Sequence, residues 1–249
     1  MRAVSRKRSH QSHPVHNRPR LWGRHAVTAA LANPKRRLVR AWATREAAEW
    51  FPAGAPITIA DAADLGRLIP RDALHQGVVI EVEPLDEVWL DHVLASTEER
   101  ATLLILDQVT DPHNVGAILR SAAAFGALAI VTQDRHSPPE SGALAKAASG
   151  ALETVPWVRV VNLARALEEI AQAGFWRIGL DGEANIDIAD ALGPKRIALV
   201  LGAEGAGLRP NTRDHCDAIA RLPITSAVES LNVSNAAAVA LYAAVVAGE

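Results

Sequence analysis

The sequence has little of what stabilises secreted or membrane-spanning proteins. It contains one cysteine, Cys216, among 249 residues, so no disulfide can form within the chain. Its longest uncharged apolar run, residues 236–247, has 12 positions and is too short to cross a bilayer. No segment near the N-terminus joins basic residues to an apolar core of signal-peptide length. We therefore expect a cytoplasmic protein with no membrane partner, in which residues 236–247 form a buried helix.

Acidic residues are absent from the first 40 positions. Residues 1–40 hold 11 of the 26 Lys and Arg residues, whereas the remainder carries 15 basic and 28 acidic residues. A strongly basic segment therefore precedes an acidic body, although the net charge is only -2. Dense positive charge binds phosphate-rich polymers because each neutralised phosphate releases counterions. This asymmetry predicts contact with RNA or DNA, and a solubilising tail is the alternative interpretation.

The chain divides into three parts by composition. Residues 1–20 are basic and too poor in apolar side chains to fold alone, which predicts a flexible arm. Residues 21–97 alternate short apolar and charged segments, which predict a small α/β domain. Its expected helices span 25–31 and 44–50, and its expected strands span 38–42, 57–59 and 78–82. The charged segment near residues 96–100 is the expected linker.

A more regular pattern follows in residues 98–249. Apolar strands are expected at 103–106, 128–131, 176–180 and 197–201, with helices at 115–125, 141–148, 163–173 and 231–246. Short apolar strands separated by helices predict a parallel α/β sheet covered on both faces. Ligands bind such sheets at the carboxyl ends of the strands. We therefore expect functional residues in the stretches that follow Leu106, Leu201 and Leu222.

The segment after Leu106 carries the first candidates. Asn114 is a plausible helix N-cap, and a buried stripe recurs from Val115 at helical spacing. Arg120 lies off that stripe, and its helical neighbours at positions 116, 117, 123 and 124 are all Gly or Ala. These small residues leave room for a bulky anion such as a phosphodiester beside the guanidinium. Periodicity by itself favours an ordinary surface arginine.

Two further segments contain glycines and polar residues at strand or helix ends. After the strand ending at Leu201, Gly202, Glu204, Gly205 and Gly207 allow close approach of a backbone to a ligand. Their spacing differs from the dinucleotide fingerprint, and no P-loop lysine follows. Before the last helix stand four polar residues, Ser230, Asn232, Ser234 and Asn235. Helical N-termini that carry such groups suit a carboxylate or phosphate.

The three segments, in this order, resemble the motifs of the SpoU, or TrmH, family of RNA ribose 2'-O-methyltransferases, within the SPOUT class. The matching positions are Asn114 and Arg120 in the first motif, Gly202, Glu204 and Gly207 in the second, and residues 230–234 (Ser-Leu-Asn-Val-Ser) in the third. The resemblance covers residues 101–247. Residues 21–97 are similar to the family's small substrate-binding domain. Ser226 departs from the pattern, because the family usually has glycine there.

The resemblance implies a fold, a cofactor and an assembly. The C-terminal chain is expected to thread through a deep trefoil knot, where S-adenosylmethionine binds in a bent form without a metal. The family works as a homodimer with active sites at the knot interface. The resemblance places the cofactor among five residues, Leu201, Gly202, Leu222, Ile224 and Leu231.

The resemblance also implies roles for the polar motif residues. In the family, the arginine that matches Arg120 has been proposed as the base, yet a guanidinium is a very poor proton acceptor at neutral pH. We expect Arg120 to hold the adjacent phosphate and to stabilise the developing alkoxide, which leaves the base open. Asn114, Glu204, Ser230 and Asn232 are expected to fix Arg120, the ribose and the methionine end.

The predicted function is methyl transfer from S-adenosylmethionine to a ribose 2'-hydroxyl of RNA. The small domain resembles the ribosomal RNA branch, so a guanosine in 23S rRNA is the expected target, and no DNA partner is expected. A tRNA ribose methyltransferase and a non-catalytic RNA-binding protein with the same fold remain alternatives. A serine hydrolase is disfavoured because no G-x-S-x-G motif occurs, and a cysteine enzyme is disfavoured because His215 beside Cys216 would point elsewhere.

Overall fold

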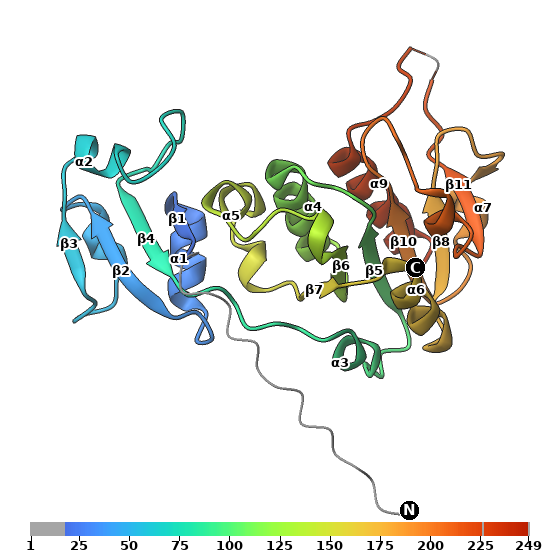
Figure 1. Cartoon of the computed structure of the whole chain (residues 1–249), viewed down its shortest axis with the longest axis horizontal. Helices are drawn as coiled ribbons and strands as arrows, with labels where there is room; N and C mark the ends of the chain where they lie inside the picture. The colour runs from blue at the N-terminus through green and yellow to red at the C-terminus, as the bar shows by residue number, and fades with distance from the viewer. Residues whose placement is uncertain (1–17, 226, 249) are drawn as a thin grey trace, which may run out of the picture.

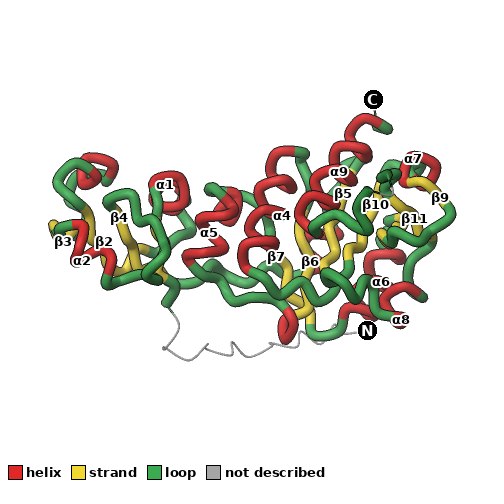
Figure 2. The backbone as a smooth tube through the Cα atoms, turned by 90° about the horizontal axis from the view of Figure 1, so that it is seen from above, coloured by secondary structure: helices red, strands yellow, loops and turns green. Residues whose placement is uncertain are grey.

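The computed structural model describes residues 18–225 and 227–248, which form two β-sheets with flanking helices. The strands of the first sheet come from residues 20–82, and those of the second from residues 101–221. The two sheet-bearing parts lie side by side along the long axis of the molecule (Figures 1 and 2). Across the described residues, no helix has both the length and the apolar character that a membrane span requires.

The small part is a four-stranded sheet of order β1-β4-β2-β3. Central β4 pairs antiparallel with β1 and β2, whereas β3 pairs parallel with β2. Its strands are β1 (Arg20–Trp22), β2 (Leu38–Ala43), β3 (Ile57–Ile59) and β4 (Val78–Val82), and its helices are α1 (Arg24–Ala32), α2 (Ala62–Gly66) and a 3₁₀ helix at Ala47–Trp50. The strands predicted at 57–59 and 78–82 are confirmed with those bounds.

The small part differs from the sequence prediction in three ways. The predicted helix at 44–50 is a 3₁₀ helix that begins only at Ala47, because the Thr44 N–H donates to the Gly77 carbonyl and prolongs the β2–β4 pairing. Strand β1 and helix α2 were not predicted. The segment predicted as a flexible arm reaches into the sheet, since Arg20 begins β1 and Arg18 pairs with Glu83. The rest of that arm, residues 1–17, lies outside the described residues.

The large part contains the predicted parallel sheet. Its order is β7-β6-β5-β10-β8-β11-β9, and every pairing is parallel. The strands are β5 (Ala101–Leu106), β6 (Ala129–Gln133), β7 (Trp157–Val160), β8 (Trp176–Leu180), β9 (Ile186–Asp187), β10 (Arg196–Leu201) and β11 (Ala218–Arg221). The four predicted strands are confirmed within two residues at each end. The other three, β7, β9 and β11, are short and were not predicted.

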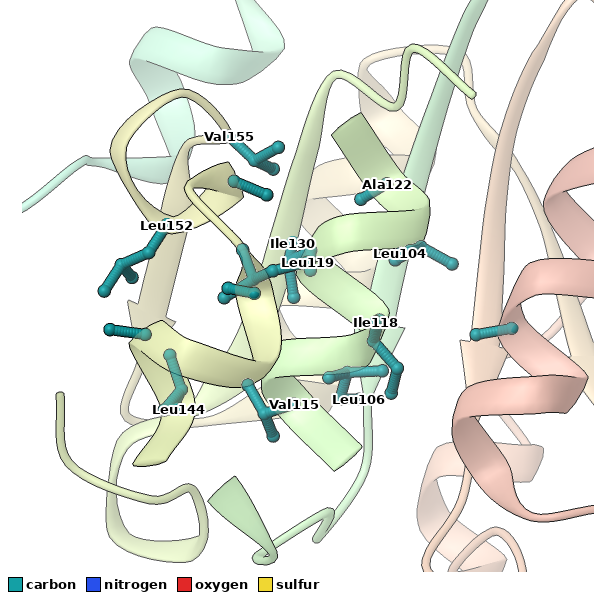
Figure 3. Close-up of a cluster of buried hydrophobic side chains, with 14 of the residues drawn as sticks. Leu104, Leu106, Val115, Ile118, Leu119, Ala122, Ile130, Leu144, Leu152 and Val155 are labelled. Atoms are coloured by element: carbon teal, nitrogen blue, oxygen red, sulfur yellow. The ribbon is translucent and has the colours of Figure 1, made fainter. Parts of the chain in front are cut away.

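Helices cover both faces of this sheet, as predicted. They are α3 (Leu90–Leu94), α4 (Pro112–Ala124), α5 (Gly142–Ala148), α6 (Leu163–Gln172), α7 (Ile188–Ala191), α8 (Pro210–Arg213) and α9 (Val233–Val246), with 3₁₀ turns at Asp134–His136 and Ala151–Glu153. Leu104 and Leu106 of β5 face α4 and α9, whereas Leu103 and Ile105 face α3 and α6. This alternation explains why residues 103–106 are all apolar, because both faces of the strand are buried. Figure 3 shows the cluster on the face that carries Leu104 and Leu106.

Helices α4 and α5 approach each other closely at Gly116. A Cβ atom on Gly116 would lie 2.4 Å from the Leu144 carbonyl oxygen of α5. Gly116 was expected to leave space beside Arg120, and the structure corrects that expectation because the missing side chain admits the α5 backbone instead. Ala123 and Ala124 do lie exposed near Arg120. The open surface beside the guanidinium is therefore formed by α4 itself.

Helix α9 is not fully buried, which corrects the expectation for residues 236–247. Ala237, Ala240 and Leu241 lie in the core, whereas four apolar side chains on the opposite side are exposed: Val239, Tyr242, Val245 and Val246. The sequence could not distinguish the two sides because the helix is apolar all round. An uncovered apolar face therefore runs along α9 in the single chain.

The two parts are joined across α5 by a cluster of buried charges. The side chain of Arg36, 1% exposed, donates to Glu153 at 2.7 Å and to Glu140 at 2.5 Å. Asn33 also donates to the Glu153 carboxylate, and the Leu85 N–H donates to Glu140. Figure 1 shows α5 between α1 and α4, so this helix links the small sheet to the large one. We call the contact of α1, β1 and residues 70–77 with α5 the domain junction.

Candidate active site

The carboxyl edge of the large sheet, where ligands are predicted to bind, contains a topological switch point between β5 and β10. These neighbouring strands are parallel, and their continuations leave the carboxyl edge in different directions. The Asp107 N–H donates to the Leu201 carbonyl at 2.8 Å, which keeps the two strand ends together. Open α/β sheets bind ligands in the crevice at such a point. The loops that start at Asp107 and Gly202 therefore frame the candidate site.

Three predicted site residues meet there. Asn114 donates from Nδ2 to Oε1 of Glu204 at 3.0 Å, and Asn232 donates from Nδ2 to the same oxygen at 2.6 Å. Asn232 Nδ2 also lies 3.0 Å from Asn114 Oδ1. The three side chains come from α4, the loop after β10 and the start of α9. They form one hydrogen-bonded network although 118 positions separate Asn114 from Asn232.

Helix capping positions two of these side chains. Asn232 is the N-cap of α9, and its Oδ1 accepts from the Ser234 N–H at 2.8 Å. Asn114 was expected to be the N-cap of α4, but Asp111 holds that position and accepts from the His113 N–H. The reason is that Pro112 occupies the first helical position, which has no N–H to satisfy. Asn114, in the buried first turn, is thereby free to bond Glu204.

Glycine geometry shapes the loop that carries Glu204. A Cβ atom on Gly202 would lie 2.1 Å from the Gly207 carbonyl carbon, so the loop can close only with glycine there. The Gly207 N–H donates to the Ala203 carbonyl, and Gly205 and Gly207 both have a positive φ. The side chain of Glu204 consequently stands on a tight turn at the sheet edge.

Sequence reasoning missed a second network beneath this loop. The carboxylate of Asp107, 0% exposed, accepts from the Arg209 N–H at 3.1 Å and from Arg209 Nε at 2.7 Å. Arg209 also donates to Oε1 of Gln133 at 3.0 Å. The network ties the second motif to the ends of β5 and β6. An available signal was a charged residue directly after an apolar strand, because such a residue needs a partner when buried.

Two predicted catalytic residues stay outside the Asn114 network. Arg120 is exposed on α4, two turns beyond Asn114, and its side chain has no hydrogen bond or ion pair with another described residue. Ser230 lies exposed in the loop before α9. The structure therefore assembles Asn114, Glu204 and Asn232, and leaves the Arg120 guanidinium available to a ligand or a second chain.

The predicted cofactor residues flank the same edge. Leu201 ends β10 in the core, Gly202 begins the glycine loop, and Leu222 and Ile224 follow β11. Leu231 precedes the N-cap of α9. The described residues of 224–231 make no hydrogen bond with other described residues, so their backbone groups can serve a ligand. Half-buried leucines beside free backbone groups fit a purine ring, which has apolar faces and polar edges. Ser226 lies outside the described residues.

The described residues offer no support for a cysteine nucleophile. Burial raises the pKa of the Cys216 thiol to about 12, so the thiol stays protonated at neutral pH. The adjacent His215 contacts Asn211 and Glu168 instead. No three His, Cys, Asp or Glu side chains in the described part lie close enough together to hold a metal ion.

Comparison with protein families finds a matching family for each of the two parts of the chain. The SpoU rRNA Methylase family matches residues 101–242, and the family described as RNA 2'-O ribose methyltransferase substrate binding matches residues 20–88. The chain belongs to the SpoU rRNA methylase family. The resemblance inferred from the three motifs is thereby confirmed, and the two matches coincide with the two sheets.

Curated relatives within the family are similar over most of their length. A Ralstonia nicotianae protein named 23S rRNA (guanosine-2'-O-)-methyltransferase RlmB is 45% identical, over 90% of this chain and 94% of the relative. A protein of the same name from Pseudomonas syringae pv. tomato is 40% identical, over 90% and 94%. The similarity to these relatives therefore extends over both parts of this chain.

Solved structures agree with this assignment. The SpoU methyltransferase AviRb from Streptomyces viridochromogenes is 25% identical and has a TM-score of 0.76, covering 92% of this chain and 88% of that one. Its complex with the cofactor AdoMet gives 26% identity and a TM-score of 0.74, with coverages of 91% and 88%. The α/β fold with an added small domain is confirmed.

Proposed function

We propose that this protein transfers a methyl group from S-adenosylmethionine to the ribose 2'-hydroxyl of a guanosine in 23S rRNA. The main observation in support is that Asn114, Glu204 and Asn232, one from each family motif, form a single hydrogen-bonded network at the switch point. The names of the curated relatives support the substrate, and the AdoMet complex of AviRb supports the cofactor. The intact network argues against a non-catalytic protein that merely keeps the fold.

The chain's own residues have distinct tasks in this reaction. S-adenosylmethionine, when bound, supplies an activated methyl group on a sulfonium, so transfer to oxygen is an in-line displacement. The Asp107–Arg209 pair holds the glycine loop against β5, and Leu222, Ile224 and Leu231 hold the adenine through backbone groups. Glu204, fixed by two asparagines, orients the reacting groups at the edge. Alignment of this kind lowers the barrier by removing the entropy cost of encounter.

Arg120 acts on the RNA in this proposal. Its guanidinium, exposed on α4, holds the phosphate next to the target ribose and stabilises negative charge that develops on the 2'-oxygen. A guanidinium does not accept a proton at neutral pH, so another group must take the proton of the hydroxyl. Ser230 is proposed to contact the methionine end or the ribose from the loop before α9.

We also propose that the protein works as a homodimer with a knotted C-terminal region. The exposed apolar face of α9 supports a second copy as its cover, because large apolar patches mark interfaces. Helix α4 packs against α9, so such a dimer would bring Arg120 close to the partner's surface. The resemblance to the family supports the knot. A cytoplasmic location and the absence of DNA and membrane partners complete the proposal.

The division into an arm, a small domain and a methyltransferase domain stays a prediction at residues 20 and 97. The contacts of α3 favour a second boundary before Leu90, since Leu90 and Val93 pack into the core of the large sheet. The isolated bridge between Val88 and Val158 likewise attaches this segment to β7.

Cofactor binding and RNA methylation test the proposed function together. Titration calorimetry in a metal chelator is expected to show binding of S-adenosylmethionine, because no side chain of the proposed site requires a metal. Methylation of a 23S rRNA transcript is then read by mapping 2'-O-methyl positions. Absence of binding at millimolar cofactor by the folded protein would exclude the enzyme. Methylation of tRNA alone would identify the protein as a tRNA ribose methyltransferase, the alternative interpretation.

Charge on the α9 face tests the homodimer. Val239→Glu introduces a carboxylate into the exposed apolar face, which a single chain tolerates and a buried interface does not. Light scattering after size exclusion is expected to report a dimer for the unmodified chain and a monomer for this variant. The control is Val161→Glu, at a residue that is 82% exposed and distant from α9 in sequence. A monomeric unmodified chain would contradict the proposal.

A further inference from the structure

A cavity lies at the domain junction, away from the Asn114 network. It is lined by Trp22, Gly23, His25, Ala26, Gln76, Lys146 and Ser149, and we call it the junction cavity. The small part supplies the first five of these residues, and α5 with its C-cap supplies Lys146 and Ser149. No acidic side chain lines it. The cavity therefore exists only when the two parts are docked, and its lining favours a negatively charged ligand.

Lys146 is the main cation of the junction cavity. Its ammonium donates to the Leu74 carbonyl, and its other two N–H donors have no acceptor among the described residues. A Cβ atom on Gly23 would lie 3.2 Å from Lys146 Nζ, so the ammonium stands directly over the Gly23 backbone. Burial lowers the pKa of Lys146, because the site desolvates the charge without supplying a carboxylate. A bound anion would offset that desolvation.

Two neutral donors accompany this charge. Gln76 uses Oε1 to accept from the Arg24 N–H at 2.9 Å, and this contact leaves its side-chain NH₂ group available. The Ser149 hydroxyl makes no hydrogen bond with another described residue, although its backbone N–H caps α5. An ammonium, an amide and a hydroxyl from separate segments match the several acceptor oxygens of a phosphate.

The backbone at this cavity is held in an uncommon conformation. Among the described residues, the non-glycine residues with positive φ are Gln76, Gln108 and Ser149, and two of them line the cavity. Gly23 has a positive φ as well. Such conformations cost energy and concentrate at ligand sites. Ser149 has this conformation as the left-handed C-cap of α5, and Gln76 has it in the turn before β4, so two strained positions of the lining carry polar side chains instead of glycine.

We propose that the junction cavity binds a backbone phosphate of the substrate RNA through Lys146, Gln76 and Ser149. This inference rests on the proposed function and adds a second RNA contact away from the target ribose. Gly150, next to Ser149, lies against α1, where its Cβ would be 3.0 Å from Ala29 Cβ. Helix α5 also packs on α4 at Gly116, within the same helix as Arg120. One RNA strand held in the cavity is thereby placed relative to the methylation site by rigid contacts.

RNA affinity as a function of salt tests the phosphate contact. Lys146→Gln is expected to weaken binding of a 23S rRNA transcript about tenfold, the loss typical of a charge-assisted hydrogen bond. The slope of log affinity against log salt should fall by about 0.7–0.9, as for one lost phosphate contact. The matched control is Lys195→Gln, an exposed lysine outside the basic segment 1–40 that does not line the cavity. Cofactor affinity, measured in the same samples, is expected to stay unchanged.

Ser149→Gly separates ligand binding from a structural role. Glycine adopts the left-handed C-cap conformation without strain, so the melting temperature is expected to stay equal or rise. The lost hydroxyl is expected to weaken RNA binding about threefold. A purely structural Ser149 would leave RNA affinity equal or improved. That outcome, together with an unchanged salt slope for Lys146→Gln, would overturn the inference.

The remaining outcomes also decide between explanations. Equal losses for Lys146→Gln and Lys195→Gln would reduce the effect to general charge and overturn the site. Competition by millimolar inorganic phosphate at constant ionic strength, lost in Lys146→Gln, would support the RNA phosphate in the cavity. Binding of phosphate at Lys146 without any effect on RNA affinity would assign the cavity to free phosphate and overturn the inference. If the unmodified protein bound RNA through Lys146 but methylated none, the cavity would stand and the proposed function would fail. If Lys146→Gln methylated RNA with an unaltered KM, the proposed function would stand and the phosphate site would fail.

Discussion

Methyl transfer by the Arg120→Ala variant is expected to be about 10²–10³-fold slower than by the unmodified protein, the loss typical of removing one group that stabilises a developing oxyanion. Cofactor affinity should stay within a factor of about two, because the Arg120 side chain forms no hydrogen bond or ion pair with the described residues of the glycine loop or of 222–231. The measurements are single-turnover methylation of the rRNA transcript and calorimetric binding of S-adenosylmethionine.

Arg120→Lys is expected to lose most of this activity as well. Lysine keeps the charge but lacks the forked pair of N–H donors that hold a phosphate bidentately. The control is Arg71→Ala, which removes an exposed arginine in the loop before β4 and should leave the rate unchanged. Near-normal turnover by the lysine variant would show that Arg120 supplies only a positive charge. A loss of cofactor affinity in Arg120→Ala would show that the guanidinium contacts the cofactor and not the RNA phosphate.

Removal of the Arg36 guanidinium is expected to have the largest effect on stability. Arg36→Met leaves Glu153, whose side chain is 3% exposed, and Glu140 without their cation. Breaking a buried ion pair from one side typically lowers the free energy of unfolding by about 3–5 kcal/mol. Burial lowers the pKa of Arg36, but the hydrogen bond to Glu153 and the charge of Glu140 raise it by more. The guanidinium therefore stays charged throughout the neutral pH range. Urea denaturation measures the change.

An exposed pair provides the comparison for Arg36. Arg165 and Glu169 form an i,i+4 ion pair on α6, with side chains that are 76% and 43% exposed. Arg165→Met is expected to change the free energy of unfolding by less than about 1 kcal/mol, because solvent screens such pairs. If Arg36→Met unfolded at the same urea concentration as Arg165→Met, the junction cluster would not hold the two parts together.

Local pattern in the sequence determined most of the secondary structure of the large sheet. The strands at 103–106 and 197–201 were predictable because every one of their residues is apolar, as in a strand buried on both faces. Strands β9 and β11 were not predicted because they have only two and four residues, too few to show a hydrophobic period. The motif order also indicated the candidate site, since each motif follows a strand or begins a helix at the carboxyl edge.

Contacts between distant segments were decided only by the tertiary structure. Nothing in the local sequence of Asp107 names Arg209 as its partner, and Arg36 finds Glu153 from 117 positions away. The junction cavity is likewise invisible in the sequence, because Gln76 and Lys146 belong to different parts of the chain. Helix α9 showed an apolar surface all round, and only packing revealed which side the core covers. The physical reason is that periodicity reports local backbone geometry, whereas the pairing of buried charges depends on how the elements pack.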